Sequence, residues 1–278
     1  MVISMAAISC MLAFLLSYLI SRASAQVTHS YCDNSKGNYT INSTYHNNLN
    51  TLLSTLSSHT QINYGFYNFS YGQNSDKVNA IGLCRGDVNP DQCRRCLNDS
   101  AATITRLCPN QKEAILWLKT NECQLRYSQR SIFGVLESSP WFHMKNSNNV
   151  TEPDKFNQAL SNLMKNLTIV AASGDSRRKY ATDSVVASNF QTIYGLVQCT
   201  PDLSETDCNR CLDGAIYEIS PCCANKKGVR VVRPSCNIRF ETYSFYDPTP
   251  KLDPDVKPPS ASPPSSFNRS SPKGTSHC

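Results

Sequence analysis

A cysteine motif that occurs twice is the feature that most constrains how this chain can fold. The spacing C-x8-C-x2-C is found at Cys84–Cys96 and again at Cys199–Cys211, and a leucine follows both copies. Two more cysteines follow each copy, so that four cysteines of the first set return after 115 residues and the fifth after 113. Chance does not produce such a register, and we infer an internal duplication that gives two similar domains.

Residues 1–25 carry the pattern of a cleaved secretory signal. An apolar stretch is followed by Ala23-Ser24-Ala25, a small-x-small cleavage pattern. A transmembrane anchor is the less favoured alternative, because Ser17 and the polar end interrupt the run near the lower length limit for a span. We therefore expect a signal peptide over residues 1–25, a secreted mature chain that begins at Gln26, and no membrane span after cleavage.

The remaining thirteen cysteines indicate disulfide bonds, because Cys10 is lost with the signal peptide and the compartment is oxidising. The C-x2-C spacing is also typical of zinc sites and of thioredoxin-type redox pairs. Zinc requires reduced thiolates, and the second domain has no histidine before His277. The redox motif requires a βαβ context that the sequence does not suggest. We expect no metal and no cofactor.

Glycosylation sequons support secretion independently. The pattern Asn-x-Ser/Thr occurs seven times, which in a chain with a signal peptide indicates a glycosylated surface. The candidate residues are Asn38, Asn42, Asn68, Asn98, Asn149, Asn166 and Asn268.

The charge distribution argues against nucleic acid as a partner. The formal net charge of the whole chain is +6. Basic residues occur in short clusters such as Arg94-Arg95 and Lys226-Lys227 rather than in one stripe, and no nucleic-acid reader motif is present. We expect a solvated, mildly basic surface.

Periodicity extends the duplication beyond the cysteines. Apolar residues from Tyr45 to Leu56 recur at steps of four, three, one and three, and the same steps recur from Phe156 to Leu167. Each run predicts an amphipathic helix, the first of which Thr44 could cap. The C-x2-C pairs are expected at the start of a second helix in each domain, where cysteines at i and i+3 share one face.

Alternating runs predict the strands. They are the aromatic segment 64–69 and the segments 80–84, 114–118 and 123–128 in the first half, and 194–199, 229–232 and 236–243 in the second. This order predicts an α+β fold with two disulfide-rich domains of about 100 residues, a normal size for one core. We expect a first repeat over 26–145, a linker over 146–155, a second repeat over 156–247 and a Pro/Ser-rich stalk over 248–278.

The doubled motif, with Pro221-Cys222-Cys223 and the segment 228–246, resembles the ginkbilobin-type (stress-antifungal) repeat of plants. The whole folded part is similar to the ectodomain of cysteine-rich receptor-like kinases and to the cysteine-rich repeat secretory proteins. The resemblance implies an antiparallel sheet of about five strands packed on two helices in each domain. It also implies the pairs Cys32–Cys108, Cys84–Cys93, Cys96–Cys123, Cys199–Cys208 and Cys211–Cys236. Cys222, Cys223 and Cys278 remain unassigned.

The resemblance also implies a sugar site. The single-domain founder of the family binds mannose through an Asn, an Arg and a Glu, and the second domain keeps the last two as Arg230 and Glu241. If these residues lie on the two strands of a hairpin, they are expected nearly opposite one another. Asn34 follows the first cysteine of the first domain, where Trp117 and Ser128 replace the Arg and Glu. A cross-strand salt bridge without a sugar is the alternative interpretation of Arg230 and Glu241.

The functions that follow are mainly recognition functions. The resemblance implies an extracellular module of the apoplast, or of the plasma membrane if the chain is part of a receptor, that binds a mannose-type carbohydrate or a cell-surface protein in stress or defence signalling. A secreted mannose-binding antifungal protein is the alternative. We expect no enzyme: the histidines His29, His46, His59 and His143 lack a nucleophile or carboxylate context, and no kinase motif is present in this chain.

Overall fold

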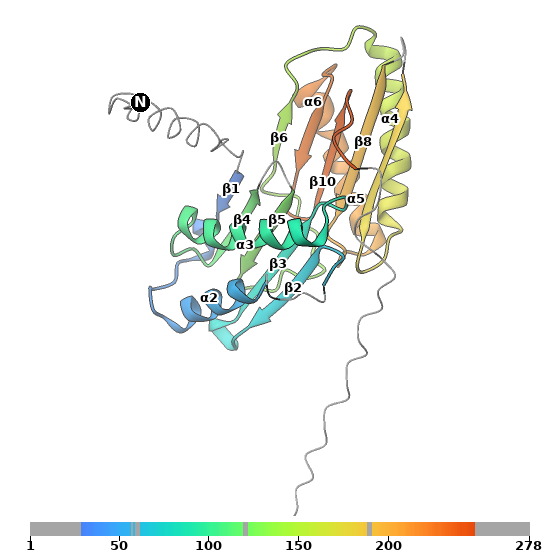
Figure 1. Ribbon diagram of the computed structural model, residues 1–278. Helices are drawn as coiled ribbons and strands as arrows, with labels where there is room; N and C mark the ends of the chain where they lie inside the picture. The colour runs from blue at the N-terminus through green and yellow to red at the C-terminus, as the bar shows by residue number, and fades with distance from the viewer. Residues whose placement is uncertain (1–28, 57, 59–61, 119–121, 188–190, 248–278) are drawn as a thin grey trace, which may run out of the picture.

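The computed structural model describes residues 29–56, 58, 62–118, 122–187 and 191–247 (Figure 1). The expected signal peptide, the expected stalk, Cys278 and the sequon at Asn268 lie outside the described residues. None of the helices within the described ranges has the length and hydropathy that a membrane span requires.

The first domain is one antiparallel sheet with two helices on one face (Figure 1). The sheet has the order β1-β4-β5-β3-β2. The helices are α2 (Thr44–Leu56) and α3 (Pro90–Leu107), and the short turns η1 (Asn34–Lys36) and η2 (Asn74–Asp76) lie in the connections. The strands are β1 (His29–Cys32), β2 (Phe66–Tyr71), β3 (Val78–Cys84), β4 (Glu113–Leu118) and β5 (Cys123–Ser128).

The second domain repeats this topology with the sheet order β6-β9-β10-β8-β7. Its helices are α4 (Pro153–Ala172), α5 (Glu205–Tyr217) and the short α6 (Ile219–Cys223). Its strands are β6 (Phe142–Lys145), β7 (Lys179–Val186), β8 (Thr192–Cys199), β9 (Val229–Val232) and β10 (Cys236–Glu241). The predicted α+β class, with two antiparallel five-stranded sheets and helices, is therefore confirmed.

The expected domain boundary needs a correction. β6 pairs with β9, so residues 142–145 belong to the second sheet and not to the first repeat. α4 begins at Pro153, inside the expected linker 146–155. The expectation of Thr44 as a helix cap also changes, because Thr44 is already helical and the hydroxyl of Ser43 accepts the N–H of His46.

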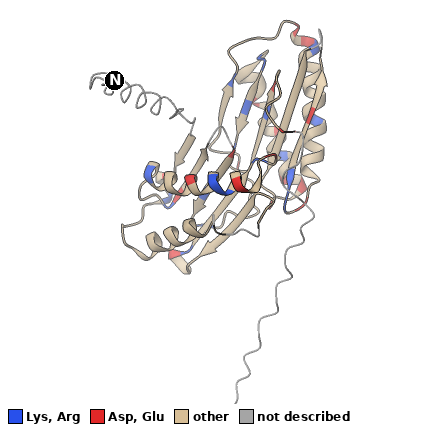
Figure 2. Ribbon diagram, in the orientation of Figure 1, with Lys and Arg blue, Asp and Glu red and all other residues tan. Residues whose placement is uncertain are grey.

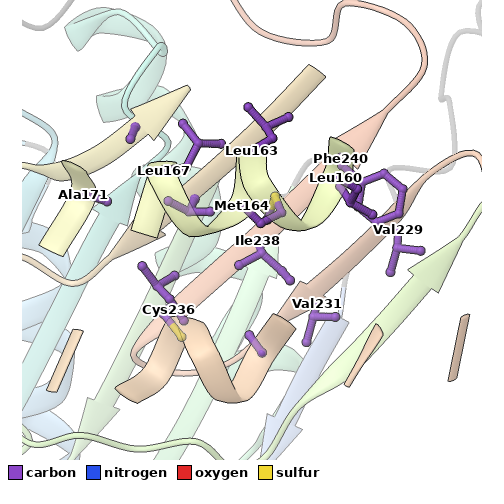
Figure 3. Packing of buried hydrophobic residues seen from close by; sticks show 14 of the residues in the cluster. Leu160, Leu163, Met164, Leu167, Ala171, Val229, Val231, Cys236, Ile238 and Phe240 are labelled. Carbon is purple, nitrogen blue, oxygen red and sulfur yellow. The ribbon is translucent and has the colours of Figure 1, made fainter. Parts of the chain in front are cut away.

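The predicted helix faces form the two cores. Each apolar run on α2 and α4 is buried against its own sheet. Figure 3 shows this packing in the second domain, where Met164 of α4 lies beside Ile238 of β10. Leu163 and Leu167 of the same helix lie against Gly195 of β8. α3 and α5 begin directly before the C-x2-C pairs, capped by Asn89 and Ser204, and they bury both cysteines of each pair.

Six disulfides connect the described cysteines. Five are the pairs that the resemblance implies: Cys32–Cys108, Cys84–Cys93, Cys96–Cys123, Cys199–Cys208 and Cys211–Cys236. The sixth joins the adjacent Cys222 and Cys223, which the sequence left unassigned. Besides the two motif disulfides, each domain has one more. In the first domain this is Cys32–Cys108, which closes a long loop, and in the second it is Cys222–Cys223, which joins adjacent residues.

The two domains meet through the sheet faces that carry no helices. Ile115 and Trp117 of β4 pack with Val232 of β9 and Phe142 of β6. The ring of Phe142 also stacks on His29 of β1, with centroids 4.0 Å apart.

Hydrogen bonds tie the same interface. The side chain of Gln124 donates to the carbonyl of Pro234 (2.7 Å), and that of Gln198 donates to the carbonyl of Cys84 (2.9 Å). A ring of Tyr180 lies so close to Gly86 that a Cβ there would be 2.4 Å from it. The interface is therefore apolar at its centre and hydrogen-bonded around it.

Candidate carbohydrate-binding site

Arg230 and Glu241 lie on the helix-free face of the second sheet. Side chains alternate across a strand, so that Val229 and Val231 of β9 enter the core while Arg230 points to the opposite face. Glu241 is on the same face of β10, because Ile238 and Phe240 occupy the core face. The predicted hairpin of β9 and β10 is present.

The register of this hairpin decides which side chains are direct neighbours. Arg239, and not Glu241, is the residue opposite Arg230. Glu241 lies one diagonal step away and forms its ion pair with Arg239, whose Nε and one terminal nitrogen both donate to Oε1 (3.1 and 3.0 Å). Arg230 itself is buried, with 7% of its surface exposed.

Gly228 gives Glu241 its position. A Cβ at residue 228 would lie 1.8 Å from Oε2 of Glu241, so the carboxylate occupies space that only a glycine leaves free. Aromatic side chains complete this edge: Arg239 donates to the hydroxyl of Tyr243 (3.1 Å), and its guanidinium lies 4.0 Å from the ring centroid of Phe245. Tyr243 is half exposed. These residues, Arg230, Arg239, Glu241, Tyr243 and Phe245, form the charged–aromatic cluster.

Electrostatics in the charged–aromatic cluster favour a ligand that accepts hydrogen bonds. Burial lowers the pKa of the Arg230 guanidinium, and the nearby charges of Arg239 and Arg85 lower it further, while Glu241 opposes the change. Arg85 comes from the first domain, and Asp87 pairs with it (2.5 and 2.8 Å). Arg85, Arg230 and Arg239 thus bring three guanidinium groups close to the carboxylates of Asp87 and Glu241, and guanidinium groups donate hydrogen bonds to hydroxyl and carboxylate oxygens.

Asn34 lies in η1 of the first domain and is exposed. The positions that match Arg230 and Glu241 in the first domain have structural contacts. The indole of Trp117 donates to Gln124 (2.7 Å), and the hydroxyl of Ser128 donates to Glu113 (2.7 Å). The structure therefore brings Arg230 and Glu241 together with Arg239, and leaves Asn34 in the other domain.

Sequence reasoning missed Arg239, Arg85, Tyr243 and Phe245. A signal for Arg239 was available, because residues 237, 239 and 241 alternate with the core residues of the predicted strand. Arg85 could not be found in this way, since it reaches the cluster from the other domain.

One group of possible metal ligands occurs within the described ranges. It consists of His143, Cys222 and Cys223, whose ligand atoms lie within 4.8 Å of one another. Both sulfurs are held in the disulfide, and metal ions bind the thiolate form of cysteine.

The sequons within the described residues all have exposed asparagines, as a glycan requires. They are Asn38, Asn42, Asn68, Asn98, Asn149 and Asn166. Figure 2 shows acidic and basic residues interspersed over both coloured domains, without a concentrated basic stripe.

These features define a class of protein, the tandem ectodomain, in which two domains of the same topology follow one another and each is held together by disulfides. The family model "Salt stress response/antifungal" matches residues 31–130 and 143–243, and the chain belongs to this family. Cysteine-rich receptor-like protein kinase 26 of Arabidopsis thaliana is 41% identical over 246 residues, which are 87% of this chain and 37% of the kinase. The chain therefore spans about a third of the length of such receptor kinases and matches their extracellular part.

Two shorter relatives match over most of their own length. An antimicrobial ginkbilobin-2-like protein of Castanea crenata is 40% identical over 77% of this chain and 86% of its own. Cysteine-rich repeat secretory protein 38 of Arabidopsis thaliana is 38% identical over 77% of this chain and 83% of its own. The relatives thus include receptor ectodomains and secreted proteins.

Solved structures agree with the fold. The tandem DUF26 ectodomain of the Arabidopsis thaliana cysteine-rich receptor-like protein PDLP5 is similar with a TM-score of 0.61 and 26% identity, over 77% of this chain and 97% of that one. The corresponding ectodomain of PDLP8 has a TM-score of 0.66 at 24% identity, over 77% of this chain and 96% of that one. The two-sheet architecture is therefore that of a tandem DUF26 ectodomain.

Proposed function

We propose that this chain is an extracellular recognition module of the plant apoplast that binds a mannose-type carbohydrate in stress or defence signalling. The observation that carries this proposal is the charged–aromatic cluster on the helix-free face of the second domain. Arg239 and Glu241 offer paired donors and acceptors, and Tyr243 offers an exposed ring beside them. Polar groups that converge next to an aromatic surface are typical of sites that orient a hydroxyl-rich ligand.

The accessible part of the cluster is expected to make the contacts. Arg230 is buried, so its role in this proposal is to hold positive charge behind Arg239 rather than to meet the sugar first. The side chains of Arg239 and Glu241 are 14% and 12% exposed, and a sugar that replaces water there would take over hydrogen bonds from both.

Calorimetric titration of the mature chain with mannose and short mannans tests this proposal. We expect saturable binding that is weakened tenfold or more by Glu241→Ala, by Arg239→Ala and by Arg230→Ala, since each change removes a charged hydrogen-bonding group. Arg210→Ala is the matched control, because Arg210 forms an exposed ion pair with Asp207 on α5. Circular dichroism establishes that each variant is folded.

Absence of binding by a correctly oxidised wild-type chain would contradict the carbohydrate proposal. If the Glu241→Ala and Arg239→Ala variants bind as well as the wild type, the charged–aromatic cluster is not the binding site. In either case a cell-surface protein that docks on the domain surfaces becomes the remaining partner.

A secreted antifungal protein that binds mannan is the second candidate. The similarity to an antimicrobial protein of nearly the same length favours it specifically. Inhibition of fungal growth by the wild type, and its loss in Glu241→Ala, would support this function. Mannan binding without any inhibition would favour the signalling role.

A further inference from the structure

A cavity lies on the opposite, helix-bearing side of the second domain, between α4, α5 and α6. Its volume is about 260 Å³. Leu160 and Met164 of α4 and Phe240 of β10 line it on one side, and Ile216 and Ile219 line it on the other. Figure 3 shows Leu160 beside Phe240 at this end of α4, with Met164 one turn further along.

In the first domain the buried ring of Tyr39 lies at the corresponding place, beside the start of α2. The Tyr39 ring stacks on His46, with centroids 5.3 Å apart, and lies 5.5 Å from Tyr45. Tyr39 is 7% exposed, and its N–H donates to the carbonyl of Asn110 (2.8 Å). The ring therefore closes the gap between the start of α2 and the segment after α3.

Val150 is the counterpart of Tyr39 in the second domain. Its N–H donates to the carbonyl of Asn225 (2.9 Å), as that of Tyr39 does to Asn110, and the preceding bridges Asn38–Gln111 and Asn149–Lys226 also correspond. His46 and Asn110 match Asn157 and Asn225, which line the cavity. The second domain therefore carries a smaller isopropyl group where the first domain has the Tyr39 ring, next to two of the residues that line the cavity.

The volume and the rim define the ligand. A cavity of about 150 Å³ holds one benzene ring, and drug-sized ligands occupy about 300 Å³ or more. The cavity therefore fits one ring with a short substituent. Among the described residues that line it, Lys226 is the charged one, and Asn157 and Asn225 add amide groups to the rim. The ammonium group of Lys226 lies near the surface, where it donates to the carbonyl of Ser147 (3.0 Å).

We propose that the cavity binds a small aromatic carboxylate whose ring takes the place that Tyr39 fills in the first domain and whose acid group pairs with Lys226. This site is separate from the charged–aromatic cluster, because core residues of the second sheet lie between the two faces. A ligand here contacts Cys223, so the vicinal disulfide forms part of the wall.

Fluorine NMR with 4-fluorobenzoate as the probe tests the proposal on the whole mature chain. We expect saturable line broadening with the wild type. Val150→Tyr should raise the dissociation constant tenfold or more, because it places a tyrosine ring at the position that Tyr39 has in the first domain. Val170→Tyr is the matched control, since Val170 is 60% exposed on α4, and it should leave binding unchanged. The substitution Val150→Tyr also keeps the sequon at Asn149 intact.

The acid group has its own test. Lys226→Gln should weaken 4-fluorobenzoate severalfold and leave the neutral 4-fluorobenzyl alcohol unaffected, whereas Lys227→Gln should affect neither. If Val150→Tyr does not fold, Ile219→Trp fills the same space from α6. The proposal is overturned if the wild type shows no saturable binding, if binding survives a folded cavity-filling variant, or if Lys226→Gln weakens acid and alcohol equally.

Discussion

The first and second domains have the same strand order and the same helix positions, yet they use matching residues differently. Trp117 and Ser128 of the first domain have structural contacts within or between domains, while their counterparts Arg230 and Glu241 belong to a charged cluster. A tyrosine ring, that of Tyr39, packs on His46 in the first domain, whereas its counterpart in the second domain is Val150 and a cavity lies beside the start of α4. The two copies thus share the strand order and the disulfides of the motif, and they differ in the side chains at the positions of the proposed sites.

The third disulfide gives the largest expected difference between the domains. Cys32–Cys108 joins residues 76 positions apart, whereas Cys222–Cys223 joins neighbours. A crosslink destabilises the unfolded chain by an amount that rises with the logarithm of the length of the loop it closes, so Cys32→Ala/Cys108→Ala should lower the free energy of unfolding by about 4 kcal/mol. Cys222→Ala/Cys223→Ala should lower it by about 1 kcal/mol or less. Hydrogen exchange in increasing denaturant, resolved by domain, measures both; equal losses would contradict the comparison.

The buried carboxylates provide the next contrast. Glu113 of the first domain accepts hydrogen bonds from Arg126 (2.6 Å), Arg130 (2.8 Å) and Ser128, whereas Glu241 forms an ion pair with Arg239. Glu113→Ala leaves a buried arginine without this partner and should reduce stability by about 3 kcal/mol. Glu241→Ala should cost about half as much, because Arg239 retains Tyr243 and Phe245. Chemical denaturation at pH 7 compares the two variants, and a larger effect of Glu241→Ala would reverse the assigned roles.

The pH dependence of stability sharpens the same contrast. Burial opposes ionisation of Glu113, but hydrogen bonds from Arg130, Arg126 and Ser128 outweigh it and hold the pKa of Glu113 below its usual 4.5. Stabilisation by this carboxylate is therefore present above pH 4.5 and is lost as the pH falls through the lowered pKa. In Glu113→Gln this component of the acid dependence should be absent. Denaturation curves between pH 7 and pH 3 test it, and an unchanged acid dependence would contradict it.

A smaller effect is expected at the contact between the domains. Burial, and secondarily the charge of Arg230, lowers the pKa of His29 below its usual 6.5. The neutral ring that stacks on Phe142 is thus favoured in the folded chain, and its stabilisation is present above pH 6.5 and lost as the pH falls through the lowered pKa. In thermal unfolding, the wild type should be less stable at pH 5 than at pH 7, and the His29→Phe variant should lack this decrease. If the variant shows the same decrease, a group other than His29 causes it.

Much of the fold could be predicted because it depends on local patterns. The apolar steps of α2 and α4 and the run of β9 are visible in the sequence, and their positions agree with the structure. β7 was missed because it lies at the sheet edge and carries polar residues such as Thr182, Asp183 and Ser184. β6 is short and mixes Phe142 with His143 and Lys145, so its pairing with β9 could not be read from periodicity.

The site was less predictable, since it depends on register and on contacts between domains. The sequence placed Arg230 and Glu241 nearly opposite one another, but it did not indicate that Arg239 is the direct neighbour of Arg230 and that Glu241 lies on the diagonal of the same face. The approach of Arg85 depends on how the sheets pack. The cavity lies where the second domain has no counterpart of the Tyr39 ring, and no local sequence pattern indicates that a ring is missing there.

The central claim is that recognition belongs to the second domain while the first supports it. Amide chemical shifts of the isotope-labelled mature chain, followed during titration with a mannose oligosaccharide, test this claim residue by residue. We predict that the perturbed amides cluster at Arg239, Glu241 and Tyr243. Perturbations confined to the first domain, for example around Asn34, would contradict it.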